Sequence, residues 1–151
     1  MKLKVPPVFI VAICAAAMWF LDQYVLSAYA YVFPYQRILS TVAFVSCMLL
    51  LMMSMYAFRK QRTTFDPTHP DKASSLVQTG IFKVSRNPMY VSMLLLLTGW
   101  AVKLGNPFGV LILILFVWYM TQFQIKAEEE ALIEVFGEEY KAYCRKVRRW
   151  V

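Results

Sequence analysis

Residues 88–125 read PMYVSMLLLLTGWAVKLGNPFGVLILILFVWYMTQFQI, and this stretch decides the fold. A single charged residue interrupts it, beside the short break LGNP. In that break Gly105 suits the left-handed turn after a helix, and Pro107 suits the first turn of the next helix. At about 1.5 Å of rise per residue, 88–104 and 107–125 would be roughly 25 Å and 29 Å long, close to the roughly 30 Å hydrocarbon core of a bilayer. We therefore predict an antiparallel hairpin of two membrane-spanning helices.

Two further apolar stretches precede this hairpin. One runs from about Val8 into the twenties, where Asp22 marks its outer end, and the other covers 35–58. Hydrophobic residues make up 60% of the 151-residue chain and charged residues only 17%, which is too apolar for a soluble domain of this size. The basic flank and apolar run at the N-terminus resemble a signal peptide, but no later segment resembles a soluble mature protein, so we expect a retained first span. The fold predicted is all-α and polytopic, with about four transmembrane helices.

Positive charge falls on one side of this arrangement. Of the 16 Lys and Arg residues, 14 lie in three places: two at Lys2 and Lys4, six in 59–90 and six in the C-terminal tail. Only Arg37 and Lys103 lie elsewhere. This is the positive-inside pattern of a membrane protein and not a nucleic-acid-binding patch, despite a net charge of +7. We expect both termini in the cytoplasm, a bacterial-type inner membrane as the location, and no nucleic-acid partner.

The whole chain is expected to form a single domain with a membrane part and a cytoplasmic part. Its segments are two N-terminal spans (1–58), a cytoplasmic loop (59–87), the hairpin (88–125) and a cytoplasmic C-terminal helix (126–151). Apolar residues of the last segment recur every three or four positions, which predicts an amphipathic helix, interrupted or bent at Gly137. Because the loop and this helix lie on the same side of the membrane, we predict that they form one cap.

A polar cluster, SRNPMY at 85–90, opens the hairpin. Asn87 before a proline is typical of a helix start, where Asn accepts hydrogen bonds from the first amides, and Asn106–Pro107 repeats this pattern with no need for chemistry. Arg86 and Tyr90 add a cation and an aromatic hydroxyl beside the free amides, which suits a polar or anionic ligand. On these residues alone the structural interpretation is the stronger one.

A second cluster, Glu128, Glu129 and Glu130, follows the last span directly. Acidic residues favour a helix start, but this helix is expected to continue from the preceding span, so its start lies elsewhere. The adjacent carboxylates repel one another and need cations, either from Lys and Arg of the loop or from the ammonium group of a ligand. Together the two clusters suit a zwitterion. His69 stands alone and the cysteines show no metal-binding spacing, so we expect no metal.

The strings LVQTGIFKVSRNPMY and EEEALIEVFGEEYKAYCRKVRRW, with the hairpin between them, resemble the isoprenylcysteine carboxyl methyltransferase family and its phospholipid methyltransferase relatives. The match covers about residues 74–150. The resemblance implies a membrane methyltransferase of the EC 2.1.1 class with S-adenosylmethionine as methyl donor, held between the start of the third span and the acidic helix. It also implies a lipophilic or small methyl acceptor: a prenylcysteine carboxylate, a phospholipid amine or a thiol.

The family pattern can be carried over residue by residue. Its Arg-His-Pro-x-Tyr motif falls on 86–90 with Asn87 in place of His, and Asn cannot titrate near neutrality. Phe82 stands where the family usually has Tyr, and Gln124 stands where the prenylcysteine enzymes have a substrate-binding Arg. The implied cofactor-binding residues are Ser74, Ser75, Leu76, Val77, Phe82, Asn87, Pro88, Met89, Tyr90, Glu128 and Glu129, with Arg86 and Asn87 as candidates for positioning and Gln124 for the substrate.

Two other classes of function remain open at this point. A small four-span transporter would use Asp22 as its central charge, and a non-catalytic membrane scaffold would keep the fold without binding a ligand. Retention or binding of S-adenosylmethionine distinguishes the enzyme from both. The oligomeric state is left open.

Overall fold

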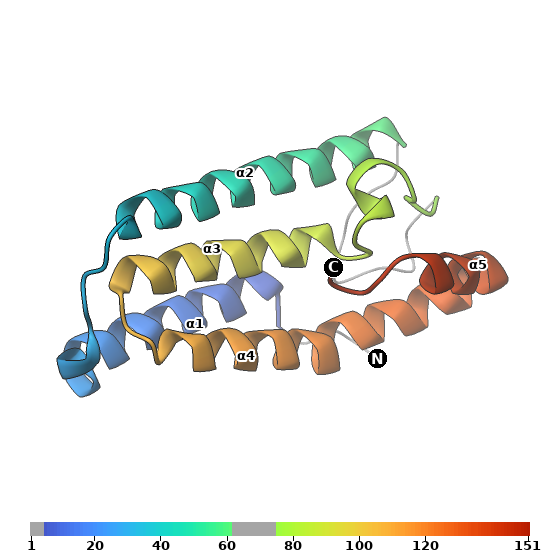
Figure 1. Cartoon of the computed structure of the whole chain (residues 1–151). Helices are drawn as coiled ribbons and strands as arrows, with labels where there is room; N and C mark the ends of the chain where they lie inside the picture. The colour runs from blue at the N-terminus through green and yellow to red at the C-terminus, as the bar shows by residue number, and fades with distance from the viewer. Residues whose placement is uncertain (1–4, 62–74) are drawn as a thin grey trace.

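The computed structural model describes residues 5–61 and 75–151, and in these residues the protein is all-α (Figure 1). The helices are α1 (Pro7–Phe20), α2 (Gln36–Lys60), α3 (Pro88–Leu104), α4 (Gly109–Tyr119) and α5 (Lys126–Lys146). A π-helical turn, Leu21–Val25, extends α1, and a second one, Met120–Ile125, joins α4 to α5. Short 3₁₀ turns lie at Ser27–Tyr29 and Gly80–Lys83.

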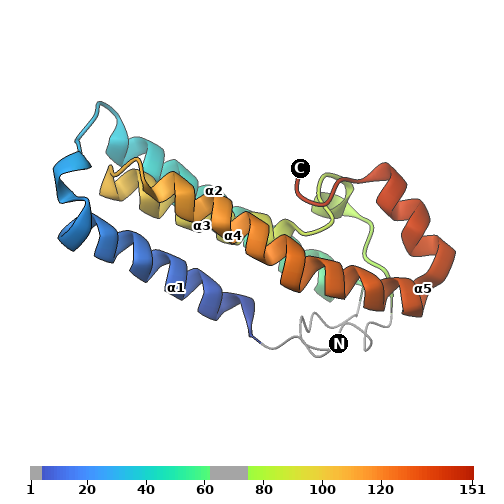
Figure 2. The same ribbon diagram turned by 90° about the horizontal axis from the view of Figure 1, so that it is seen from below.

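Helix α3 is the centre of the bundle, with α2 on one side and α1 and α4 on the other (Figures 1 and 2). It lies close to α2 at Gly99, where a Cβ atom would lie 2.9 Å from Phe44 Cε1 and 3.2 Å from Ala43 Cβ. In lipid, helices associate chiefly through close van der Waals packing, which small residues permit. Gly99 therefore lets α2 and α3 pack along their length.

Among the described residues, three helices are long and apolar enough to cross a membrane: Pro7–Val25, Gln36–Lys60 and Gly109–Lys146. Large hydrophobic side chains stay exposed along them, as at Met52 in α2 and Ile114 in α4, which are 56% and 60% exposed. Lipid contact accounts for such surfaces. The chain is an integral membrane protein. Helix α3 has 17 residues, which is shorter than the other three, and its role as a fourth span remains a prediction.

The predicted hairpin between α3 and α4 is confirmed. Gly105 ends α3 in the left-handed conformation with φ 72°, and a Cβ atom there would lie 2.4 Å from the carbonyl oxygen of Tyr31. Asn106 caps the following turn, since its Oδ1 accepts from the amide of Phe108 at 3.2 Å. Asn106 Nδ2 also donates to Asp22 Oδ1 at 3.2 Å, which fixes the end of the first helix against the hairpin.

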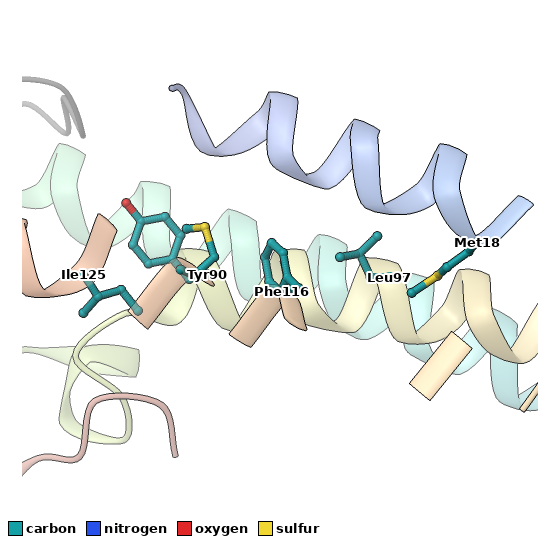
Figure 3. Packing of buried hydrophobic residues seen from close by; sticks show 6 residues of the cluster. Met18, Tyr90, Leu97, Phe116 and Ile125 are labelled. Atoms are coloured by element: carbon teal, nitrogen blue, oxygen red, sulfur yellow. The ribbon is translucent and has the colours of Figure 1, made fainter. Parts of the chain in front are cut away.

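The main core runs along the seam between α1, α3 and α4 (Figure 3). Its buried members are Met18, Tyr90, Leu97, Phe116, Met120 and Ile125. Tyr90 lies toward the Ile125 end of this row in Figure 3. The same packing that closes the core therefore also holds a phenolic hydroxyl at the start of α3.

Helix α5 continues from α4 through the π-helical turn Met120–Ile125, and the helical turns are unbroken up to Gly137. The predicted bend at Gly137 is confirmed, with φ 53° and ψ −124° inside α5. The prediction of a helix over 126–151 is wrong at its end, because α5 stops at Lys146 and Val147 is extended. The reason is tertiary: the amide of Arg86 donates to the carbonyl of Arg148 at 3.0 Å, which draws the last residues out as an extended tail.

The part of the loop that the structure describes packs against α5, so the predicted cap is present there. Tyr140, Tyr143 and Val147 form a buried cluster with Leu76. The Tyr143 hydroxyl donates to the carbonyl of Phe82 at 2.6 Å. The start of α1, the start of α3 and the C-terminus lie at one end of the bundle (Figures 1 and 2).

Candidate functional site

Three buried polar side chains meet at the start of α3. The Tyr90 hydroxyl donates to Glu128 Oε1, and Gln124 Nε2 donates to the same oxygen at 2.6 Å and to the Tyr90 hydroxyl at 3.3 Å. Their exposed fractions are 2%, 8% and 5% for Tyr90, Glu128 and Gln124. Gln124 belongs to the second π-helical turn, a type of irregularity that is frequent at functional sites. We call these three residues the carboxylate cluster.

Glu128 lies past Ile125, where the apolar part of the long helix ends. Among the described residues, no cation lies within ion-pair distance of its carboxylate. Burial raises the pKa of Glu128 to about 7, although the hydrogen bonds from Tyr90 and Gln124 act in the opposite direction. Of the two predicted sources of cations, the Lys and Arg residues of the loop and the ammonium group of a ligand, the first does not serve Glu128 in the described part of the chain. Two neutral donors reach it instead.

In contrast, Glu129 has two arginines within ion-pair distance in the described part of the chain. Arg86 Nη1 lies 2.9 Å from its Oε1, while Arg149 donates Nε to Oε1 at 2.9 Å and Nη2 to Oε2 at 2.6 Å. The hydrogen bond to Glu129 raises the pKa of Arg149, already a permanent cation. Glu130 is exposed. Arg86 belongs to the loop whose Lys and Arg residues were one predicted source of cations. Arg149 was not predicted, and its only signal was a basic tail beside an acid that needed a partner.

One buried donor of Arg86 has no acceptor among the described residues. Its side chain is 10% exposed, and Nη1 also donates to Cys144 Sγ at 2.6 Å. Within residues 5–61 and 75–151, its buried Nε has no hydrogen-bond partner. Buried polar groups are nearly always paired, and each exception needs a reason. A ligand acceptor is one such reason.

The predicted helix start is confirmed, since Asn87 is the N-cap residue of α3, but its side chain does not accept from the first amides as expected. The helix begins at Pro88 with no side-chain hydrogen bond from Asn87 to its first amides. Asn87 Nδ2 instead donates to the carbonyl of Arg149 at 3.0 Å, and its backbone amide donates to Ser85 Oγ at 3.1 Å. The C-terminal tail passes close enough to offer a competing acceptor, and this sets the direction of the side chain.

The C-terminal tail, Val147–Val151, crosses the start of α3. Arg149 contributes its carbonyl to Ser85 and Asn87 and its guanidinium to Glu129, and Trp150 Nε1 donates to Thr121 Oγ1 at 3.0 Å. The tail therefore ties the polar motif of α3 to the acidic start of α5. Nothing periodic in the sequence indicated this, because the contacts are made by an extended segment.

The remaining predicted residues lie in separate places. Val77 and Phe82 pack with Ala57 at the end of α2, in a different cluster from Tyr90. Leu76 packs on the tyrosines of α5, and Ser75 Oγ donates to the carbonyl of Gln61 at 3.4 Å. Pro88 is buried and Met89 half-buried in the first turn of α3. Ser74 and His69 lie outside the described residues. The cofactor contacts of this set remain predictions, and the described residues contain no cluster suited to a metal ion.

The fold and site define an integral membrane protein with a closed polar cluster where the central helix begins. Comparison with known proteins then places it in a family. Residues 35–139 match the family model for phospholipid methyltransferase, and the chain belongs to that family. The resemblance drawn from the two motifs is thereby confirmed.

Individual relatives extend this result. The chain is 38% identical over 72 residues to the protein-S-isoprenylcysteine O-methyltransferase of Saccharomyces cerevisiae, covering 48% of this chain and 30% of the yeast protein. It is 36% identical over 73 residues to the Mus musculus protein of the same name, covering 48% and 26%. It is 48% identical over 63 residues to an uncharacterized protein of Haemophilus influenzae, covering 42% and 100%. The matched part thus spans less than a third of the yeast and mouse methyltransferases.

Proposed function

We propose that this protein is an S-adenosylmethionine-dependent membrane methyltransferase acting on a lipophilic or small acceptor. The observation that carries the proposal is that, among the described residues, a buried donor lacks an acceptor and a buried carboxylate at the same site lacks a cation. Arg86 offers a buried Nε donor without an acceptor, and Glu128 offers a buried carboxylate without a cation, among the residues described. Leaving such groups unpaired is costly, so a ligand that satisfies both would bind with a large gain.

S-adenosylmethionine fits these groups chemically. Its methionine part carries a carboxylate and an ammonium, and its sulfonium is a second cation. Arg86 would hold the carboxylate, and Glu128, supported by Tyr90 and Gln124, would hold the positive end. We assign Ser74–Val77, Phe82 and Asn87–Met89 to the remaining cofactor contacts, on the family pattern.

The protein's part in the reaction is positioning. The cofactor supplies an activated methyl group, whose bond electrons return to sulfur as a lone pair of the acceptor forms the new bond. Aligning two bound reactants can supply roughly 7–11 kcal/mol of the barrier, so a strong base is not required for a carboxylate, amine or thiolate acceptor. Asn87 in place of His agrees with this view, since its amide is directed at the backbone of Arg149.

The acceptor we propose is lipophilic and reaches the site from the bilayer, while the soluble donor reaches it from the aqueous side. The family model and the relatives' names each point to such acceptors, a phospholipid in one case and a prenylated cysteine in the other. Gln124, in place of a substrate-binding Arg, argues against a prenylcysteine carboxylate. Labelled methyl transfer into a lipid extract, compared with transfer into soluble thiols, separates these classes.

We also propose a four-span topology with the cap and both termini in the cytoplasm. Of the described basic residues, Arg59 and Lys60 end α2, and Lys83 and Arg86 precede α3, at the end of the bundle where the C-terminus also lies (Figure 1). Helix α3 is short for a span, but it is enclosed by its neighbours and its own length need not match the bilayer. Labelling single introduced cysteines from either side of intact vesicles tests the orientation.

Binding of S-adenosylmethionine to the purified protein, measured by calorimetric titration, tests the central assignment. Glu128→Gln should weaken binding by roughly tenfold or more, since a buried cation loses its partner. Glu130→Gln removes a neighbouring exposed carboxylate and should bind as the wild type does. Equal affinity of the Glu128 and Glu130 variants would refute the assignment. No binding by the folded wild type would support a scaffold instead.

The contacts of Asp22 argue against the transporter alternative. Asp22 accepts from Asn106 at 3.2 Å and from Gln23 at 2.9 Å, at the end of the bundle opposite the carboxylate cluster. A buried carboxylate held by two neutral amides joins helix ends and is a poor candidate for a mobile central charge. We therefore favour the enzyme.

A further inference from the structure

A groove lies at the end of the bundle away from the carboxylate cluster, between the start of α2 and the end of α3. Its volume is about 850 Å³. Helix α3 has 17 residues, so its start and its end lie about 24 Å apart at the rise of an α-helix. The groove is therefore distinct from the site described above, on the opposite side of the apolar core.

Two basic residues line the groove, and they are the ones that lie outside the chain's three basic groups. Arg37 and Lys103 are the only Lys or Arg residues outside the three basic groups, and both line the groove. Both are exposed, and in the described part of the chain neither makes an ion pair. Lys103 Nζ lies over the ring of Trp100, 5.3 Å from its centre, in a cation–π contact. Asp22, a buried acid at this end, is held by Asn106.

The rest of the lining is largely apolar. Val32, Ile38, Phe44 and Leu104 form much of it. Gln36 joins the two walls, because its Nε2 donates to the carbonyls of Val102 and Lys103 at 2.9 and 3.1 Å. A cationic rim beside an apolar wall, at the end of membrane helices, suits a molecule with an anionic head and a hydrocarbon tail.

We propose that this groove binds one anionic phospholipid from the surrounding leaflet. The phosphate contacts Arg37 and Lys103, and an acyl chain follows Phe44 and Leu104 between α2 and α3. The lipid bridges the ends of two helices that are otherwise tied there by Gln36. Lipid binding at this site requires neither a methyl donor nor the proposed activity, so the two proposals can be tested independently.

Native mass spectrometry of the detergent-solubilised protein tests the proposal, with phosphatidylglycerol and phosphatidylcholine as probes. The wild type should retain one phosphatidylglycerol in preference to phosphatidylcholine. The double variant Arg37→Gln, Lys103→Gln should bind it roughly thirtyfold more weakly, since each basic group near an anionic lipid contributes about 1 kcal/mol. The matched control is Arg59→Gln, Lys60→Gln, which removes two exposed cations from the other end of α2 and should retain the lipid.

Three results would overturn the proposal. They are equal loss of lipid in the control variant, equal retention of the two lipids by the wild type, and displacement of the lipid by millimolar inorganic phosphate alone, which would indicate a simple anion site. Because Arg37 and Lys103 are exposed, the double variant should fold, and a matching thermal unfolding midpoint checks this. The charge-preserving variant Arg37→Lys, Lys103→Arg should bind as the wild type does.

Discussion

The Tyr90 hydroxyl hydrogen-bonds the Glu128 carboxylate across 38 positions of the chain. This contact joins the first turn of α3 to the first turn of α5 and makes one cluster of two motifs that are separate in the sequence. Gln124 completes it by donating to both residues. Since the described residues supply no cation there, the cluster can accept a positive ligand group without first breaking an ion pair.

Tyr90→Phe should destabilise the protein modestly and weaken ligand binding less than Glu128→Gln does. The variant keeps the aromatic packing but removes one donor to a buried carboxylate, a loss of about 1.5–3 kcal/mol. Denaturant unfolding in detergent and calorimetric titration measure the two effects. Tyr56→Phe is the control, since Tyr56 is 67% exposed on α2 and should leave both values unchanged. Complete loss of binding in Tyr90→Phe would mean that the hydroxyl itself holds the ligand.

Stability of the ligand-free protein should fall as the pH rises from about 4.5 to 7. The pKa of Glu128 is raised from its ordinary 4.5 to about 7, so the folded state favours the protonated carboxyl. That contribution is complete below the unfolded pKa and is lost as the pH passes through the folded pKa. Thermal unfolding over this range should show the decline in the wild type. In Glu128→Gln this component should be absent, and an unchanged pH profile would contradict the assigned pKa.

The affinity for a cationic ligand should change with pH in the opposite sense. Deprotonating Glu128 creates the charge that the ligand needs, so binding should strengthen as the pH rises toward 7 and level off above it. Glu128→Gln should bind weakly with no such rise. Titrations at several pH values measure this. A wild-type affinity that stays flat through the range would place the ligand's cation elsewhere.

Arg149→Gln should loosen the C-terminal tail. It removes two hydrogen bonds to Glu129, at 2.9 and 2.6 Å, and leaves that carboxylate to Arg86. Because the Arg149 side chain is 33% exposed, solvent offsets part of the loss, and about 1–2 kcal/mol is expected. The unfolding midpoint and the rate of C-terminal proteolysis should both change. Arg145→Gln is the control, because Arg145 is exposed on α5. Equal effects of the two variants would show that Arg149 does not specifically hold the tail in place.

Gly105→Ala should destabilise the protein more than Gly137→Ala. Both glycines have positive φ, 72° and 53°, so each substitution strains the backbone by about 1 kcal/mol or more. Only at Gly105 would the new Cβ also meet backbone, at 2.4 Å from the Tyr31 oxygen, whereas nothing lies within 4 Å at Gly137. The difference between their unfolding free energies measures the clash. Equal losses of unfolding free energy would show that the segment before α2 moves to make room for the new Cβ atom.

The sequence by itself determined the features that depend on nearby residues. The bounds of α3, the turn at Gly105 and the bend at Gly137 follow from apolar runs and glycine, because helix geometry and backbone sterics are local. The pairing of Arg86 with Glu129 was also within reach, since adjacent acids at a membrane surface need cations. The family motifs indicated which two segments would meet.

The tertiary structure alone decided how those segments are joined. Asn87 carries a helix-start pattern, yet it binds the backbone of Arg149, because an extended tail supplies an acceptor that no local rule describes. Glu128 and Glu129 are neighbours with the same side chain, yet among the described residues Glu129 receives two arginines and Glu128 only neutral donors. Their directions on the helix differ, and each meets what long-range packing places opposite it. Contacts between distant segments depend on the whole bundle, so residue type and spacing cannot determine them.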